Sequence, residues 1–381
     1  MIHSFFRFTI GNSWRRIHAM KRTTRRIIFY VLVLLFAVAG PLAVFTSLGY
    51  TFRFSTATFE STGGIFIKSD TARTSVFLDG TFVRETGFLT GSTLMTDVAP
   101  GTHVLRLEKP DFRPWTKTVT VASGAVTEFR DVFLIPHRPV SATSTRQELT
   151  RAQATSTPLL AFSLDKKNRL SVTENRRARV IAENVHSFVP VASGAYFVGQ
   201  NGFFARYDVT SGETETLGRP GFFLGAKPFR FSQNGRVLAI IDSSGGLFLF
   251  DDSAGAVRPV LSDVQEVYFD TTEEKLLAVK EQVLDIVWLA DNEYQPFQKQ
   301  GALETVVQTT DPIREADWYY ETEQHVVYRT RAGVFITETD RRGGDNTAEI
   351  ISGPVDEIIT SPITPRTIFY RKEKGIYKIE L

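Results

Sequence analysis

The feature that most constrains this chain is an uncharged stretch from Ile27 to Phe52. Its first part, Ile27–Leu48, is almost wholly apolar, and a helix of that length, rising ~1.5 Å per residue, can cross a ~30 Å hydrocarbon core. The segment before it carries seven basic residues and no acid. Because Lys and Arg beside a first spanning helix stay in the cytoplasm, we predict a basic cytoplasmic tail over 1–26, a transmembrane helix over 27–50 and extracytoplasmic domains beyond. The lipid bilayer would contact Ile27–Leu48 of a single-pass cell-membrane protein.

Two other interpretations of this stretch stay open. Ala37-Val38-Ala39 has the small-x-small form of a signal-peptide cleavage site, so the helix could be removed. The apolar character nevertheless continues to Leu48, and Pro41 closely follows the supposed cut. A buried core helix would need a polar face, which this stretch lacks. An uncleaved anchor fits these observations best.

Composition narrows the classes of function. The formal net charge of +2 includes seven positive charges from residues 1–26, so the remainder is mildly acidic and no nucleic-acid partner is expected. The chain has no cysteine, which excludes disulfides, thiolate metal sites and cysteine nucleophiles. Its 42% hydrophobic residues, with 31 Phe, can supply cores without disulfides.

Residues 62–136 show strand and turn patterns without helical periodicity. Turn signals such as Asp79-Gly80 separate short runs of β-favouring residues. The expected strands are Ile65–Ile67, Ser75–Leu78, Thr81–Val83, His103–Leu107, Lys117–Val121 and Asp131–Leu134. In the fifth run Val119 and Val121 share one face, whereas Lys117 is grouped with the polar residues. This pattern predicts a small antiparallel β-sandwich.

Several motifs of this segment follow one order. Asp79-Gly80 closes the second strand, the turn 99–102 leads into the run 103–107, and Asp111-Phe112 follows. In these features the segment resembles the PEGA domain, a β-sandwich module of bacterial envelope proteins, which usually has Gly-Tyr in place of Asp111-Phe112. The literal Pro-Glu-Gly-Ala letters are absent. The resemblance implies a sandwich fold and an envelope or surface-layer setting.

Residues 137–158 are rich in Ser, Thr, Ala, Arg and Gln and contain no Phe, Tyr or Trp. Because such a stretch buries little apolar area, we predict a flexible linker.

Residues 159–381 contain a weak repeat of about 40 residues, each unit having an apolar strand, a tight turn and a second strand. The first strands are expected at 159–162, 195–198, 237–241, 276–279, 326–328 and 368–370, and the second at 169–172, 203–207, 247–250, 283–288, 334–336 and 376–379. A further strand precedes most pairs, at 229–231, 266–269, 316–319 and 357–359. This period is typical of β-propeller blades.

The repeat resembles the divergent WD40-like propellers of exported bacterial proteins, in pattern only, because the Gly-His and Trp-Asp marks are absent. We expect about six blades, with a range of five to seven, and an insertion or degenerate strand around Gly301–Asp311. The last blade would be completed by a strand from around 155–165. An array of β-sandwiches is the alternative. The predicted fold class is all-β outside the membrane, after a single N-terminal helix.

The sequence predicts no catalytic, cofactor-binding or metal-binding residues. The four histidines beyond the apolar stretch lie at unlike positions and none has a second histidine nearby, as a metal site would need. Trp318-Tyr319-Tyr320 is the one candidate for ligand contact, because three aromatic rings on a propeller face can stack on a sugar or peptide. Such residues also pack between blades.

Taken as a sequence, the chain predicts a membrane-anchored, non-catalytic binding or scaffold protein of the bacterial cell envelope. Its partner would be an envelope protein or a wall glycan of unknown identity, recognised through the propeller face. A propeller-type hydrolase or lyase and a ligand-sensing subunit are the alternatives. An enzyme would need carboxylates or histidines at equivalent blade positions, and a sensor would need a cytoplasmic output domain larger than the predicted tail.

Overall fold

The computed structural model describes residues 22–47, 50–53, 58–153, 160–174, 177–191, 193–218, 237–251 and 256–381. Helix α1 (Arg22–Ser47) continues through Pro41. Over Arg22–Val44 it is long and apolar enough to cross a membrane, and its most apolar window is not buried in the protein. A helix of this kind near the N-terminus is consistent with a signal anchor or a signal sequence. Most of the predicted basic tail, residues 1–21, lies outside the described residues.

A β-hairpin and a seven-stranded sandwich follow the helix. The hairpin strands are β1 (Tyr50–Arg53) and β2 (Thr58–Ser61), and the sandwich strands are β3 (Gly63–Ser69), β4 (Ser75–Leu78), β5 (Thr81–Glu85), β6 (Ser92–Val98), β7 (Gly101–Glu108), β8 (Trp115–Val121) and β9 (Val126–Val132). One sheet has the order β6-β3-β9 and the other β5-β4-β7-β8. Ile65 and Ile67 of β3 pack against Leu105 and Leu107 of β7 in one buried core.

The predicted Asp79-Gly80 turn is confirmed. Both residues have positive φ angles, 50° and 79°, and they connect Leu78 of β4 to its partner Thr81 of β5. Two residues in this conformation give a tight turn whose twist matches the flanking strands, and glycine and aspartate adopt it most readily.

The sandwich differs from the sequence prediction in two respects. Strand β6 has no counterpart there, because only Met95 and Val98 of its seven residues are buried and the apolar pattern is weak. Strand β9 pairs with β3 in parallel, so the sandwich is not wholly antiparallel. Strand β9 (Val126–Val132) also begins and ends earlier in the chain than the predicted run Asp131–Leu134. The reason is that Phe133 and Ile135 pack in the core of the following domain rather than in the sandwich.

The described residues that follow the sandwich form six sheets, which we call the sheet array. Its strands are β10 (Ser141–Thr143), β11 (Ala161–Leu164), β12 (Leu170–Glu174), β13 (Arg177–Ala182), β14 (Val185–Val191), β15 (Gly194–Gly199), β16 (Phe204–Asp208), β17 (Thr214–Gly218), β18 (Val237–Ile241), β19 (Leu247–Asp251), β20 (Ala256–Leu261), β21 (Glu266–Phe269), β22 (Lys275–Val279), β23 (Val283–Trp288), β24 (Leu303–Gln308), β25 (Glu315–Trp318), β26 (His325–Arg329), β27 (Gly333–Glu338), β28 (Thr347–Ser352), β29 (Glu357–Ile359), β30 (Thr367–Lys372) and β31 (Gly375–Glu380). In the described residues the sheets are β11–β13, β14–β17, β18–β20, β21–β24, β25–β28 and β10-β31-β30-β29. All are antiparallel, and four of them have four strands, so the array is propeller-like.

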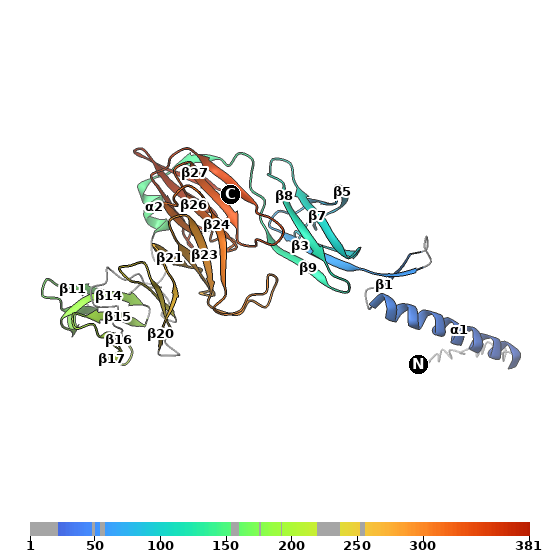
Figure 1. Ribbon diagram of the computed structural model, residues 1–381, viewed down its shortest axis with the longest axis horizontal. Helices are drawn as coiled ribbons and strands as arrows, with labels where there is room; N and C mark the ends of the chain where they lie inside the picture. Colours follow the sequence, from blue (N-terminus) through green and yellow to red (C-terminus); the bar gives the residue numbers. More distant parts are fainter. Residues whose placement is uncertain are drawn as a thin grey trace, which may run out of the picture.

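Consecutive sheets of the array share hydrophobic cores. Tyr196 of β15 packs with Phe250 of β19, and Leu249 of β19 shares the next cluster with Val287 of β23. The same arrangement links each further pair of neighbouring sheets. The apolar strands therefore recur because each sheet must bury its faces against its neighbours. In Figure 1 the sandwich lies between α1 and the later sheets, and the early sheets lie at the opposite end of the molecule.

The last sheet takes its fourth strand from β10, whose Ala142 pairs with Lys378 of β31. The prediction placed this closing strand around 155–165, but β11 at Ala161–Leu164 belongs to the first sheet instead. The segment predicted as a flexible linker thus contributes β10 and also helix α2 (Arg146–Ala152). Thr145 and Glu148 form a capping box at the start of α2, and buried apolar residues hold the helix on the last sheet.

The region around Gly301–Asp311, where we expected an insertion or a degenerate strand, contains a regular strand, β24. The additional residues lie in the connection 289–302 between β23 and β24, which we call the long loop. The predicted strand 229–231 lies outside the described residues.

Candidate functional site

The sandwich is fixed to the sheet array by an interface that begins on β8. Burial along this strand alternates strictly, with Trp115, Lys117, Val119 and Val121 on the buried side. Because alternate side chains of a strand share a face, Lys117 points inward with the apolar residues. Its side chain is completely buried.

The Lys117 ammonium group is bound by the connection between β27 and β28. It pairs with the carboxylate of Glu338 and donates to the carbonyl oxygens of Asp340 and Gly344, at 2.5 and 2.6 Å. Trp115 Nε1 donates to the other Glu338 oxygen at 2.8 Å. Burial raises the pKa of Glu338, and the ion pair with Lys117 acts in the opposite direction. A buried charge bonded in this way fixes the relative position of the two bodies.

The same connection pairs with the free edge of β8. The amide of Thr118 donates to the carbonyl of Gly343 at 2.7 Å. The Asn346 side chain accepts from the Thr116 amide and donates to the Thr116 carbonyl. Gly343 has a φ of 68°, and a Cβ atom there would lie 1.9 Å from the Thr118 oxygen. This close approach requires glycine.

The long loop makes a second contact, with β9. The Gln295 side chain accepts from the Glu128 amide at 3.1 Å and donates to the Val126 carbonyl at 2.9 Å. Arg342 donates to Gln295 Oε1 at 2.9 Å and to the Glu128 carbonyl at 2.8 Å. Its guanidinium carbon also lies 4.9 Å from the Phe129 ring centroid.

An aromatic contact completes the interface. The Phe133 ring lies 5.2 Å from Tyr319 and 5.3 Å from His325, between ring centroids. His325 is buried, and desolvation, followed by the nearby cations Lys117 and Lys275, lowers its pKa to about 3. The imidazole is therefore neutral across the physiological range.

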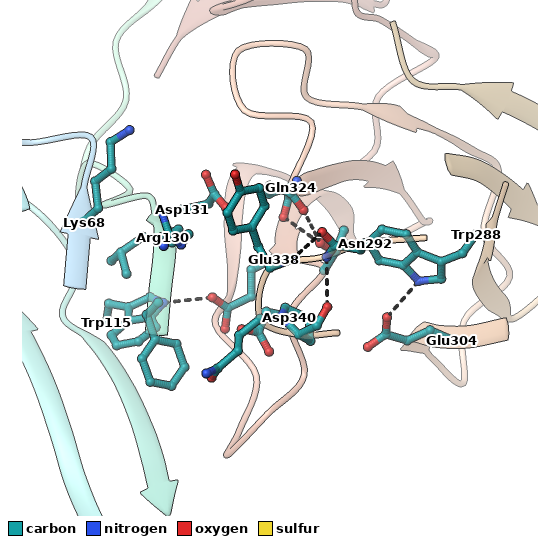
Figure 2. A pocket seen from close by; sticks show the side chains of 16 residues that line it. Lys68, Trp115, Arg130, Asp131, Trp288, Asn292, Glu304, Gln324, Glu338 and Asp340 are labelled. Carbon is teal, nitrogen blue, oxygen red and sulfur yellow. Dashed lines mark hydrogen bonds between the residues drawn. The ribbon is translucent and has the colours of Figure 1, made fainter. Parts of the chain in front are cut away.

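Between these contacts the interface encloses a cavity of about 250 Å³, which we call the interface cavity (Figure 2). Its lining residues are Lys68, Trp115, Phe129, Arg130, Asp131 and Val132 of the sandwich and Trp288, Asn292, Tyr294, Gln295, Pro296, Glu304, Gln324, Glu338, Thr339 and Asp340 of the array. The array residues lie in or beside the connections β23–β24, β25–β26 and β27–β28. In an antiparallel meander these connections lie on one side of the sheets, so the sandwich covers part of a turn-bearing face.

Most charged groups around the cavity are already paired. Glu338 is bonded to Lys117, and Asp340 is bonded to Arg342 at 2.6 Å. Arg130 is bonded to Glu128 at 2.6 Å. These pairs leave the cavity with few groups that still lack a partner.

Several side chains of the cavity lining retain bonding capacity, among them the Tyr294 hydroxyl. Among the described residues, Lys68 and Asp131 have no hydrogen bond or ion pair, and the amide nitrogen of Gln324 has no acceptor. Glu304 accepts only long hydrogen bonds at one oxygen, from Trp288 at 3.4 Å and Gln298 at 3.3 Å. Figure 2 shows Lys68 and Asp131 on the sandwich side and Gln324, Trp288 and Glu304 on the array side.

The carboxyl groups of Asp131 and Glu304 both have raised pKa values. Asp131 lies at the mouth of the cavity and is exposed as a residue, yet the surrounding protein desolvates its carboxyl group and raises its pKa. Desolvation likewise raises the pKa of Glu304. No group of three His, Asp or Glu side chains is placed to hold a metal ion in the described part of the chain.

The aromatic run Trp318-Tyr319-Tyr320 lies between sheets and away from the cavity lining. Trp318 and Tyr319 are fully buried. Trp318 Nε1 donates to the Tyr268 carbonyl at 2.9 Å, and the Tyr320 hydroxyl donates to Asp317 at 3.1 Å. Trp318 and Tyr319 therefore pack between sheets, whereas Tyr320 is half-buried.

The sequence reasoning missed the residues of the interface cavity. One signal was available: Lys117 is two residues from Val119, so strand alternation places it on the apolar face and calls for a buried partner. The partner Glu338 is far along the chain, and no local pattern connects it with Lys117.

Comparisons with known proteins agree with part of this description. Residues 62–133 match the family model of the PEGA domain, as the motifs predicted. A search of the curated proteins finds no match to the chain. Among solved structures, YCF48 from Cyanidioschyzon merolae is similar with a TM-score of 0.39 and 11% sequence identity, covering 81% of this chain and 96% of that chain. The chain thus contains a PEGA domain at 62–133, preceded by the apolar helix and followed by the sheet array described above.

Proposed function

We propose that this protein is a membrane-anchored, extracytoplasmic binding protein of the bacterial cell envelope, without catalytic activity. The observation that carries the proposal is the interface cavity, where a PEGA domain and a sheet array are locked together around groups that retain bonding capacity. The partner is an envelope protein or a wall glycan. The bound partner would contact both bodies at once.

The placement outside the cytoplasm rests on charge and length. Seven basic residues precede the apolar stretch, and the helix over Arg22–Val44 is long enough to span the bilayer. Basic residues beside a first spanning helix remain in the cytoplasm. We infer that α1 is an uncleaved anchor and that the six sheets are blades of one propeller.

A site-specific crosslinker tests the binding proposal. Tyr294 lines the cavity and its side chain is exposed, so a photoreactive amino acid there should capture the partner in intact cells. The matched control is the same amino acid at Leu89, which is exposed on the sandwich and does not line the cavity. Equal capture at both positions, or none at Tyr294, would contradict the proposal.

Reporter fusions test the topology. A periplasm-only reporter fused after Leu381 should be active, and a cytoplasm-only reporter should be silent.

A hydrolase or lyase is the second candidate function. The observation in its favour is that Asp131 and Glu304 line one cavity and both have raised pKa values, as catalytic acids often do. An enzyme predicts that a captured substrate is cleaved and that Glu304→Gln abolishes cleavage while binding persists. The binding proposal predicts that the molecule captured by the wild-type protein is recovered intact.

A further inference from the structure

We propose that the interface cavity binds one sugar residue of a glycan. This inference rests on the proposed binding function and names its ligand class. The starting point is the mixed character of the groups that retain bonding capacity: Lys68 and the Gln324 amide donate, whereas Asp131 and Glu304 accept. A sugar hydroxyl donates one hydrogen bond and accepts others, so neighbouring hydroxyls can satisfy both kinds of group.

The charge balance favours a neutral ligand. A cation entering the cavity would meet Lys68 and Arg130, and an anion would meet Asp131 and Glu304. Neither sign of charge is favoured throughout the lining. A polyhydroxylated ring carries no charge and avoids both penalties.

The walls of the cavity are suited to a sugar ring. The exposed aromatic side chain of the lining is Tyr294, with 60% of its area accessible, whereas Trp115, Phe129 and Trp288 are each no more than 5% exposed and add only small apolar patches. Apolar faces of a pyranose pack on aromatic rings, as other amphipathic ligands do. With about 250 Å³, the cavity is smaller than the ~300–1,000 Å³ of sites for drug-sized ligands, so it fits one ring.

The site is also held in place before a ligand arrives. The Asn292 side chain donates to the Pro296 carbonyl at 2.8 Å, and Gln295 is bonded to both backbone partners on β9. Glu338 and Asp340 are fixed by their ion pairs. Because these lining groups need no reorganisation, the remaining free groups can act as a preformed recognition set.

Titration of the detergent-solubilised full chain tests the inference. The probes are glucose, galactose, mannose and N-acetylglucosamine, with tryptophan fluorescence and calorimetry as readouts. We expect at least one of the sugars to bind saturably and to change the Trp288 signal, an effect lost in Trp288→Phe. Lysine and acetate serve as cationic and anionic probes and should not compete.

Variants identify the site. Asp131→Asn and Glu304→Gln should each raise the Kd at least tenfold, because each weakens acceptors for sugar hydroxyls. Glu281→Gln, at an exposed acid outside the cavity, should leave the Kd unchanged. Unchanged circular dichroism and melting temperature would show that the variants fold.

The inference is overturned if no sugar binds, if the variants bind like wild type, or if lysine or acetate displaces the sugar. Crosslinking at Tyr294 separates the two proposals. A protein partner captured there, with no sugar binding, would refute the sugar site and retain the binding function. No capture and no sugar binding would refute both.

Discussion

At the residue scale, the buried pairing of Lys117 with Glu338 joins the sandwich to the array. Replacing Lys117 by Met removes the cation and leaves the Glu338 carboxylate buried without its partner. We expect Lys117→Met to lower the free energy of unfolding by about 3–5 kcal/mol. Chemical denaturation of the solubilised protein measures this loss.

Two further variants separate this contact from a general effect of losing a lysine. Lys166→Met removes an exposed lysine and should change the stability by less than about 0.5 kcal/mol. Lys117→Met combined with Glu338→Gln no longer buries a lone charge, and it should recover part of the loss. If Lys117→Met is as stable as Lys166→Met, the ion pair does not hold the sandwich to the array.

His325 predicts a dependence of stability on pH. Its folded-state pKa of about 3 lies below the ordinary 6.5, so below pH 6.5 the unfolded chain binds a proton that the folded chain does not. The stability is therefore fully present above pH 6.5 and falls by about 1.4 kcal/mol for each pH unit below it. Between pH 6.5 and 5, His325→Gln should lose about 2 kcal/mol less than wild type, as measured by denaturation at each pH.

The comparison must be made as a difference between wild type and variant, because Asp317 acts in the opposite direction. Its carboxyl group is buried and desolvation raises its pKa to about 6. The folded chain therefore takes up a proton there before the unfolded chain does, and stability is gained as the pH falls through 6. A His325→Gln variant with the same pH profile as wild type would contradict the assignment.

At the scale of elements, the cap of α2 supports a segment that composition alone marks as disordered. The Thr145 hydroxyl accepts from the Glu148 amide at 3.2 Å, and the Glu148 carboxylate accepts from the Thr145 amide at 3.0 Å. We expect Thr145→Ala to destabilise the protein by about 1 kcal/mol. Thr150→Ala, within the same helix and away from the cap, is the control and should be neutral. Thermal denaturation distinguishes the two, and equal melting temperatures would refute the cap's contribution.

The same elements show what the sequence could predict. The strand pairs of the array and the Asp79-Gly80 turn were predictable, because buried strands need recurring apolar runs and a two-residue turn needs particular φ angles. Strand β10 was not, since all three of its residues are exposed and no apolar pattern marks its pairing with β31. The interface cavity could not be predicted from the sequence either, because its two walls come from segments far apart in the chain.

At the scale of the whole molecule, the sandwich and the array should behave as one body. A flexible linker would make the region between them the first site of proteolysis, whereas β10 and α2 are tied into the last sheet. We therefore expect trypsin to cleave slowly at Arg146 and Arg151, as followed by mass spectrometry under native conditions. Thr145→Ala should accelerate both cuts. Rapid release of an intact sandwich fragment from the wild-type protein would contradict this prediction.

The pairing of β10 with β31 has a consequence for biogenesis. On the proposed topology the polypeptide threads outward in order, so β10 emerges early and its partner emerges only after every intervening sheet. During that interval its hydrogen-bonding groups stay unmatched. A stalled export intermediate would display an unfinished sheet, which chaperones and envelope proteases could distinguish from the completed protein.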